Sequence, residues 1–321
     1  MSGRVLAVVG PTGAGKSALG IELARRLGGE VVNADSMQLY RGMDIGTAKL
    51  SMAEREGIPH HLLDVWDVTE SADVARYQAM ARAEIERLLA GGRVPVLVGG
   101  SGLYVRAVLD DLDFPGTDPV ARAQLEDDLA RLGPAPLHER LAELDPEAAT
   151  TILPSNGRRI VRALEVVGLR GSFRATLPAP SPVYDALQIG IDRADLDERL
   201  RLRTRRMFEA GLIEEVETLE LCGLRAGRTA SRALGYAQVL LARDEIAAGA
   251  EPGDAFGRAQ QATCQATRRF ARRQRAWFSR DPAVRWLSGP NPSELTDDAS
   301  ASSFRDQAVT AAEKWWNVSH R

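Results

Sequence analysis

Residues Gly10–Ser17 read GPTGAGKS, and they stand between the apolar run VLAVV (5–9) and the sequence ALGIELARRLGG (18–29). The run has the β-branched, apolar content of a strand, and the sequence after the loop has helical periodicity. In this context the stretch matches the phosphate-binding pattern GxxxxGK[ST] at Gly10, Gly15, Lys16 and Ser17. Backbone N–H groups of such a loop converge on phosphate oxygens, and the helix N-terminus adds the positive end of its dipole. The stretch therefore predicts a site for a phosphorylated ligand, without identifying that ligand.

Further short apolar runs have the composition of strands, at 30–34, 61–65, 95–100, 187–191 and 284–287. Helical patterns separate the earlier runs, as in ADVARYQAMARAEIERLLAGG (72–92). Strands that alternate with helices indicate a parallel sheet of the α/β class. Because the glycine-rich loop follows the first strand, we expect a P-loop NTPase-like parallel sheet core.

The alternation of strands and helices stops after FPGTDP (114–119) and returns only after TLPAPSP (176–182). Between these two proline-containing breaks the sequence has helical periodicity alone, which predicts a helical domain inserted into the core. The expected boundaries are 1–115 and 183–290 for the core with its C-terminal helices, 116–182 for the insertion, and 291–321 for a tail with a short helix. Two or three further helices are expected in the second part of the core, the last of them ending near Arg280.

Composition limits the classes of function. The 321 residues carry a net charge of -3, so any binding to nucleic acid must come from local clusters of charge. The chain has two cysteines, Cys222 and Cys264, and they form no CxxC pair. No segment approaches about 18 uninterrupted apolar residues. We therefore expect a cytoplasmic protein that does not enter a membrane.

Polar residues follow two of the predicted strands, where ligands bind in open α/β sheets. Asp35 begins the block DSMQLYRGMDIGTAK (35–49), and it either accepts a proton there or caps the following turn. Ser101, in GGSGLY (99–104), follows the fourth strand and is expected near the same crevice. His60 and His61 adjoin each other, but neighbours on a strand point to opposite faces, so we expect core or edge histidines and no metal pair.

Arginine clusters stand out from the acidic average of the chain. They lie in TRRFARRQRAWFSR (267–280), in ERLRLRTRRMF (198–208), and at 158–162, where Arg158 and Arg162 share one helix face. A single run of this kind is usually a solvated helix face. Three runs in a chain with a phosphate site favour a polyanionic partner.

Seven stretches resemble one known family in both order and spacing: GPTGAGKS, NADSMQLYRGMDIGTAK, GIPHHLLD, GGSGLY, RRIVRALEV, ALGY and TRRFARRQRAWF. The family is that of the tRNA dimethylallyltransferases, also called tRNA isopentenyltransferases, and the likeness extends over about residues 5–278. It implies an enzyme that transfers the dimethylallyl group of dimethylallyl diphosphate to the N6 amine of adenosine 37, beside the tRNA anticodon. It also implies Mg²⁺ as cofactor and a monomer that binds the anticodon stem-loop. The loop of a nucleotide-binding, ATP-binding fold would then hold a diphosphate leaving group.

The resemblance assigns roles to individual residues. Diphosphate binding falls to Gly10, Pro11, Thr12, Gly13, Ala14, Gly15, Lys16 and Ser17. Asp35 would be the general base, with Lys16 and Ser101 as the other catalytic residues and Ser17 as the Mg²⁺ ligand. Contacts with tRNA fall to Asp35, Ser36, Met37, Gln38, Ser101, Arg122, Arg158, Arg159, Ile160, Val161, Arg162, Arg268, Arg272 and Arg273. Gln38 would read the adenine edge, since its amide offers both a donor and an acceptor.

The chain departs from the family pattern at three places: Ser101 stands where Thr is usual, Arg158 replaces a common Gln, and Ala237 replaces a basic residue. Other interpretations of the residues also exist. A P-loop with an acidic base describes small-molecule and nucleoside kinases. An isopentenyltransferase acting on free AMP or ADP would need no arginine-rich surface, and an RNA-binding module would not need an intact P-loop.

Overall fold

The computed structural model describes residues 3–288 and 298–317. The chain divides into two compact units, one formed by Met1–Asp111 with Pro182–Arg321 and the other by Leu112–Ser181. From the sequence we expected the insertion at 116–182. Of the expected tail, residues 291–297 and 318–321 lie outside the described residues, and the part between them forms a helix.

A six-stranded parallel sheet forms the first unit, with the order β3-β2-β4-β1-β5-β6. Its strands are β1 (Arg4–Val9), β2 (Gly29–Asn33), β3 (His60–His61), β4 (Val94–Gly99), β5 (Asp185–Asp192) and β6 (Val284–Ser288). The strand that leads into the glycine-rich loop, β1, lies between β4 and β5. The predicted fold class, a P-loop NTPase-like α/β sheet, is confirmed.

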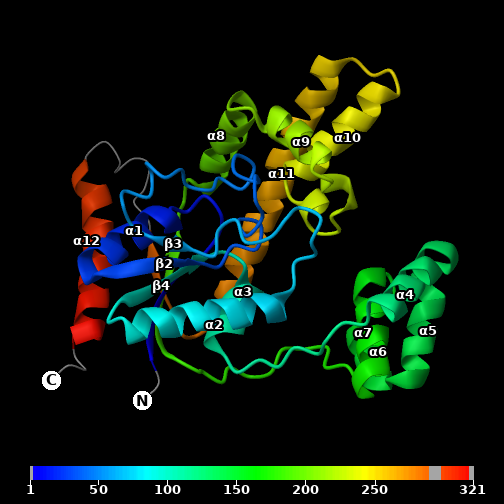
Figure 1. The fold of residues 1–321 in the computed structure, drawn as a ribbon, viewed down its shortest axis with the longest axis horizontal. Coiled ribbons are helices and arrows are strands. Elements are labelled where there is room, and N and C mark those ends of the chain that lie inside the picture. The colour runs from blue at the N-terminus through cyan, green and yellow to red at the C-terminus, as the bar shows by residue number, and fades with distance from the viewer. Residues whose placement is uncertain (1–2, 289–297, 318–321) are drawn as a thin grey trace. The chain divides into compact units, whose positions relative to one another are not determined.

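Helices cover both faces of this sheet (Figure 1): α1 (Lys16–Leu27) and α12 (Asp298–Asn317) on one face, α2 (Val74–Ala90) and α3 (Gly102–Leu109) on the other. Side chains of β1 alternate between them, as the strand period of two requires. Leu6 and Val8 pack with α1, whereas Val5 and Ala7 pack with α2 and α3. All four side chains are fully buried.

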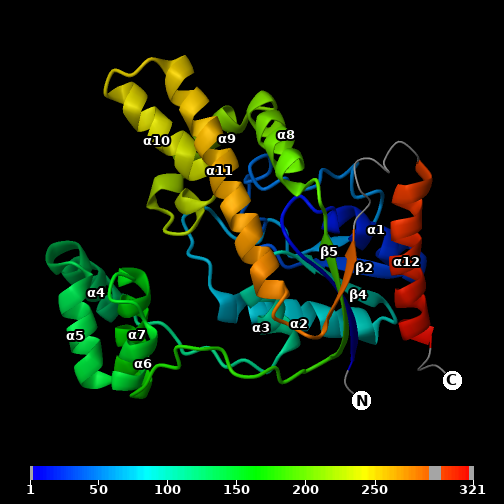
Figure 2. The ribbon, with the colours of Figure 1, turned by 180° about the vertical axis from the view of Figure 1, so that it is seen from behind.

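The remaining helices of the core are α8 (Leu196–Glu209), α9 (Leu212–Leu221), α10 (Tyr236–Ala247) and α11 (Pro252–Phe278), with short 3-10 turns at Leu224–Ala226 and Ala230–Arg232. Figure 2 shows α8 and α10 on either side of the long α11. The expectation of two or three helices was too low, because Gly211 and Gly223, with φ of 101° and 87°, break what looks like one periodic stretch. The predicted end of the last helix, near Arg280, agrees with the end of α11.

The third predicted strand, 61–65, was wrong for most of its length, since β3 contains only His60 and His61. Leu62 and Asp64 have φ of 60° and 56°, in the left-handed region that no strand adopts. The Asp64 carboxylate binds the buried Lys49 ammonium at 2.6 Å. The strand therefore ends at His61, and the contact with Lys49 holds the chain that follows it.

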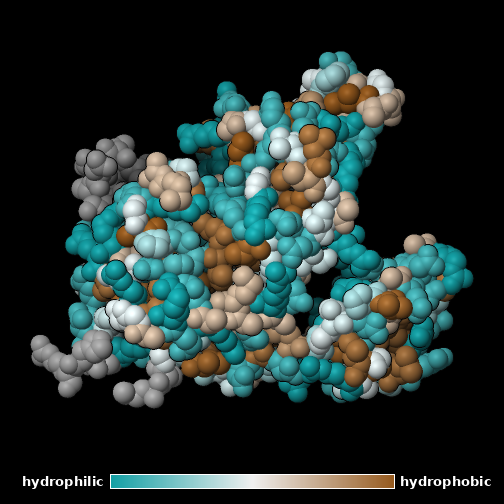
Figure 3. Space-filling model, viewed as in Figure 1, coloured by the Kyte–Doolittle hydropathy of each residue, from teal (hydrophilic) through white to brown (hydrophobic). Residues whose placement is uncertain are grey.

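The second unit is a helical bundle by itself, made of α4 (Pro119–Leu132), α5 (Pro134–Leu144), α6 (Pro146–Thr151) and α7 (Gly157–Arg170). Prolines begin three of these helices, where the missing N–H costs nothing. Its core contains Leu125, Leu137, Leu141, Ile160, Val161 and Leu164. Figure 3 shows hydrophobic atoms among hydrophilic ones on its surface, where the large exposed apolar side chains are Val120, Leu132, Leu144, Leu153, Leu169 and Leu177.

Candidate active site

The glycine-rich loop leaves β1 through backbone conformations that require glycine. Gly10, Gly13 and Gly15 have φ of 133°, 83° and 104°. A Cβ at Gly10 would lie 2.5 Å from the carbonyl oxygen of Ile191 on the neighbouring strand. Gly15 caps α1, whose first turn has no acidic residue and whose first N–H groups have no partner within the helix. The loop therefore presents donors and positive potential to an anion.

Lys16 folds back over this loop, and its Nζ donates to the carbonyl oxygen of Pro11 at 2.9 Å. Burial lowers the pKa of Lys16 to about 8; the nearby Asp35 carboxylate opposes this shift, and the Arg203 guanidinium adds to it. Pro11 and Ala14 are buried, so they offer only main-chain groups to a ligand. An anion on the loop would give the Lys16 ammonium a partner of opposite charge and so stabilise its charged form.

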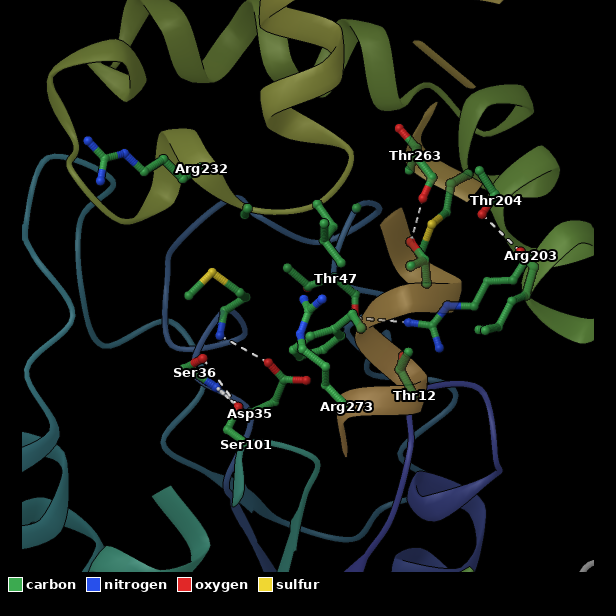
Figure 4. A pocket seen from close by; sticks show the side chains of 18 residues that line it. Thr12, Asp35, Ser36, Thr47, Ser101, Arg203, Thr204, Arg232, Thr263 and Arg273 are labelled. Atoms are coloured by element: carbon green, nitrogen blue, oxygen red, sulfur yellow. Dashed lines mark hydrogen bonds between the residues drawn. The ribbon is translucent and has the colours of Figure 1, made fainter. Parts of the chain in front are cut away.

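A cavity of about 310 Å³ opens beside the loop (Figure 4). Thr12 of the loop lines it together with side chains from the ends of β2 and β4 and from α8 and α11. Its polar residues are Thr12, Asp35, Ser36, Thr47, Ser101, Arg203, Thr204, Arg232, Thr263, Thr267 and Arg273. Its apolar wall is formed by Met37, Leu200, Met207, Ala233, Leu234 and Phe270. A ligand with a charged and an apolar end suits such a lining.

Asp35 caps the turn that follows β2 and also lines the cavity. One carboxylate oxygen accepts from the N–H of Met37 at 3.0 Å, which caps the turn after β2. The same side chain lines the cavity, and Figure 4 shows its carboxylate directed toward the middle of the space. Asn33 fixes the backbone here, because its Oδ1 accepts from the N–H of Asp35 at 2.9 Å.

Ser101 lies at the start of α3 and joins the ends of two strands. Its Oγ accepts from the N–H of Ser36 at 3.2 Å and lies 3.2 Å from the Ser36 Oγ. Both hydroxyls line the cavity. Gln38, by contrast, is not among the lining residues: its Nε2 donates to the carbonyl oxygens of Thr47 and Ala48, at 3.1 and 3.4 Å.

Arg203 is a cavity residue that the sequence analysis did not single out. Its Nη2 donates to the carbonyl oxygen of Thr47 at 3.3 Å, and burial lowers its pKa while the Asp35 carboxylate raises it. Arg203 lies in α8 near Leu196 and Leu200, which are both buried. An arginine near the apolar face of an amphipathic helix was the signal that could have identified it.

Helix α11 contributes a second side of the site. Phe270 and Arg273 line the cavity, with the guanidinium 5.7 Å from the ring centre. The buried Gln274 amide accepts from the N–H of Thr12 at 2.8 Å and donates to the carbonyl oxygen of Gly100 at 2.9 Å. It thereby joins the glycine-rich loop to the end of β4.

The arginines expected to contact tRNA differ in how they are held. In α11, Arg272 and Arg273 are exposed, whereas the half-buried Arg268 donates to the carbonyl oxygen of Asp197 at 3.3 Å. In the helical unit, Arg158 and Arg159 are exposed.

Other residues of the helical unit that were expected to contact tRNA stabilise the unit itself. The buried Glu165 carboxylate pairs with Arg162 at 2.8 Å and with Arg122 at 3.5 Å. Ile160 and Val161 are 0% and 2% exposed in the core of this unit, so their side chains are not available to an RNA surface. The helical period explains this, since part of any contiguous helical block must face inward.

The adjacent histidines lie at the sheet edge, as expected. The ring of His60 lies 2.8 Å from the carbonyl oxygen of Ile58, and the ring of His61 lies between the carboxylates of Glu30 and Glu84, at 2.6 and 3.0 Å. Over residues 3–288 and 298–317, no cluster of three His, Cys, Asp or Glu side chains is arranged to hold a metal ion. In the same ranges, no helix has both the length and the apolar character to cross a membrane.

Comparison with known proteins identifies the lineage of this site. Residues 38–281 match the family model described as IPP transferase. The chain belongs to the IPP transferase family. The family predicted from the seven motifs is confirmed, because curated relatives are named tRNA dimethylallyltransferase; one from Parafrankia sp. is 65% identical over 290 residues, 90% of this chain and 89% of the relative.

Solved structures of the family share the fold. A full-length tRNA isopentenylpyrophosphate transferase from Bacillus halodurans matches with a TM-score of 0.68 and 35% identity, over 100% of both chains. A eukaryotic dimethylallyltransferase, described as acting on tRNA, matches with a TM-score of 0.74 and 26% identity, over 94% of this chain and 77% of that one. Membership of this family makes the chain an enzyme of the prenyltransferase class.

Proposed function

We propose that this protein transfers the dimethylallyl group of dimethylallyl diphosphate to the N6 amine of adenosine 37 in tRNA and releases diphosphate. The observation that carries this proposal is the cavity in which an anion-binding loop, a carboxylate and an apolar wall meet. The names of the relatives support the reaction class. Its tRNA substrate implies that the enzyme acts in the cytoplasm.

The polar and the apolar side chains that line the cavity suit the two ends of an allylic diphosphate. The diphosphate would lie on the N-terminus of α1 against Lys16, with the Arg203 guanidinium as a second cation. The five-carbon chain would contact Met37, Leu200 and the other apolar side chains of the lining. Hydrophobic burial and charge neutralisation thus act on separate parts of one small molecule.

The reaction needs a base, since the attacking N6 amine loses a proton as its nitrogen bonds to the allylic carbon. Asp35 is suited to accept that proton, because its carboxylate is directed into the cavity while its capping bond to Met37 fixes its position. As the carbon–oxygen bond to diphosphate breaks, negative charge grows on the leaving oxygen. This charge is stabilised by Lys16, by Arg203 and by the N–H groups of the loop. The stabilisation is stronger in the transition state than in the ground state, because the charge on the leaving oxygen is larger there.

Mg²⁺ fits this site as a cofactor that would neutralise part of the diphosphate charge. Ser17 lies in the first turn of α1, half-buried beside Lys16, and its hydroxyl would be the protein ligand. Magnesium in such sites takes its other ligands from substrate phosphates and water, so a cluster of protein carboxylates is not required.

The RNA must deliver its adenine into the cavity, and a stacked base has to leave the stack to do so. Exposed arginines suit the phosphates of the RNA backbone: Arg272 and Arg273 in α11, and Arg158 and Arg159 in the helical unit. Arg273 also lines the cavity itself, next to the ring of Phe270, on which a base or a prenyl chain could pack.

The proposal is tested by incubating the protein with tRNA, dimethylallyl diphosphate and Mg²⁺ and analysing the tRNA nucleosides by mass spectrometry. We expect a prenylated adenosine that depends on dimethylallyl diphosphate and not on ATP. A parallel reaction with free AMP and ADP tests the alternative that the enzyme is an isopentenyltransferase of free nucleotides, which would prenylate AMP or ADP. A phosphorylated product formed from ATP would support the kinase alternative and refute the proposal.

A further inference from the structure

The loop between β2 and β3 is held by one carboxylate outside the catalytic motifs. Glu215, in the first turn of α9, accepts from the backbone N–H groups of Asp44, Ile45 and Gly46 at 3.1, 2.7 and 3.1 Å. The hydroxyl of the buried Tyr236 donates to the same carboxylate at 2.5 Å. Three consecutive amides and a phenol thus converge on one side chain, and hydrogen bonds to an ionised acceptor are the strong ones.

The segment held in this way forms a wall of the cavity. Gly46 and Thr47 line the space, and the carbonyl oxygen of Thr47 accepts from Arg203. Gly46 packs directly on Tyr236: a Cβ there would lie 2.4 Å from the phenol ring. The loop therefore needs glycine at 46 to lie against Tyr236, whose hydroxyl is bonded to Glu215.

We propose that Glu215 is a positioning residue for the transfer reaction, which fixes Asp44–Gly46 so that the Thr47 carbonyl orients Arg203 toward the diphosphate. This inference rests on the function proposed above. Glu215 is not among the residues that line the cavity, so it acts through the loop and not on the substrate. The chain of contacts runs from Glu215 to the loop amides, from Thr47 to Arg203, and from Arg203 to the ligand.

The test compares Glu215→Gln with Glu214→Gln, a substitution at the neighbouring position of the same helix. Glutamine has nearly the same shape as glutamate but only one acceptor oxygen. Its NH₂ group is a donor and would face the backbone N–H groups of the loop, which are also donors. We expect faster hydrogen–deuterium exchange in a peptide covering 43–49, about 10-fold weaker binding of inorganic diphosphate, and a matching fall in kcat/KM for prenyl transfer. The control variant should leave all three unchanged.

A mutant cycle shows whether the effect passes through Arg203. Arg203→Gln should weaken diphosphate binding, and adding Glu215→Gln should weaken it little further, because the residue being oriented is already gone. If Glu215→Gln does not fold, Tyr236→Phe serves instead, since it removes one hydroxyl and keeps the carboxylate; a smaller effect in the same three readouts is expected.

Three outcomes overturn the inference. Unchanged exchange over 43–49 would mean that the carboxylate does not hold the loop. Faster exchange with unchanged diphosphate binding would make Glu215 structural only. Additive effects in the cycle would mean that Glu215 does not act through Arg203. The exchange and diphosphate measurements use neither tRNA nor dimethylallyl diphosphate, so they judge Glu215 even if the parent enzyme transfers no prenyl group.

Discussion

The lowered pKa of Lys16 makes the affinity for diphosphate depend on pH in a specific way. Burial lowers this pKa to about 8, so the ammonium is charged in about nine-tenths of the molecules at pH 7 and in about one-tenth at pH 9. If only the charged form binds tightly, the apparent Kd for diphosphate rises about tenfold between these two pH values. A lysine with the ordinary value of 10.5 would lose almost nothing over the same range.

The assay is calorimetric titration with inorganic diphosphate from about pH 6.5 to pH 9.5, with Lys16→Met as the matched variant. Diphosphate itself takes up protons in this range, and the variant reports that contribution alone. We expect the ratio of variant to parent Kd to fall about tenfold between pH 7 and pH 9 as the parent loses its charge. A ratio that stays constant across the range would refute the argument, because Lys16 would then be charged throughout or would not contact the anion.

Two further predictions follow from the site. Asp35→Asn keeps an oxygen that can accept from the N–H of Met37, but its side chain cannot take up the proton of the amine. We therefore expect kcat at saturating substrates to fall by about 10²- to 10⁴-fold, with the affinity for tRNA unchanged. A fall of only a few-fold would show that Asp35 is not the base. Replacing Arg272 and Arg273 with Ala should weaken tRNA binding. In titrations at several salt concentrations, the slope of log K against log[salt] should become shallower by about 0.7 to 0.9 for each phosphate that is no longer neutralised. Equal slopes for the parent and the double variant would mean that the RNA binds elsewhere.

Much of the core could be predicted from the sequence because each strand and the glycine-rich loop is a contiguous pattern. The order of the strands could not, since it depends on contacts between segments distant in the chain. The same holds where local pattern failed: Lys49 binds Asp64 and the chain leaves β3 early, and glycines with positive φ at 211 and 223 divide one periodic stretch into separate helices.

The candidate site likewise contains residues that local motifs predict and residues that depend on contacts between distant segments. The P-loop, Asp35 and Ser101 belong to local motifs, and the structure brings Asp35 and Ser101 together with Thr12 around one cavity. Arg203 joins that cavity from α8; the sequence placed it in the arginine cluster 198–208, and its place beside buried leucines was the further signal that it faces inward. The block at 158–162 illustrates the opposite error, because a contiguous motif on a helix includes residues such as Ile160 that face the core.

The central claim is that the P-loop holds an allylic diphosphate whose prenyl group passes to tRNA. The most direct measurement is mass spectrometry of nucleosides from tRNA treated with the purified protein, dimethylallyl diphosphate and Mg²⁺, beside an identical reaction with ATP in place of the allylic diphosphate. The account predicts a dimethylallylated adenosine in the first reaction, release of one diphosphate for each transfer, and no change in the second. Unmodified adenosine together with consumption of ATP would contradict it.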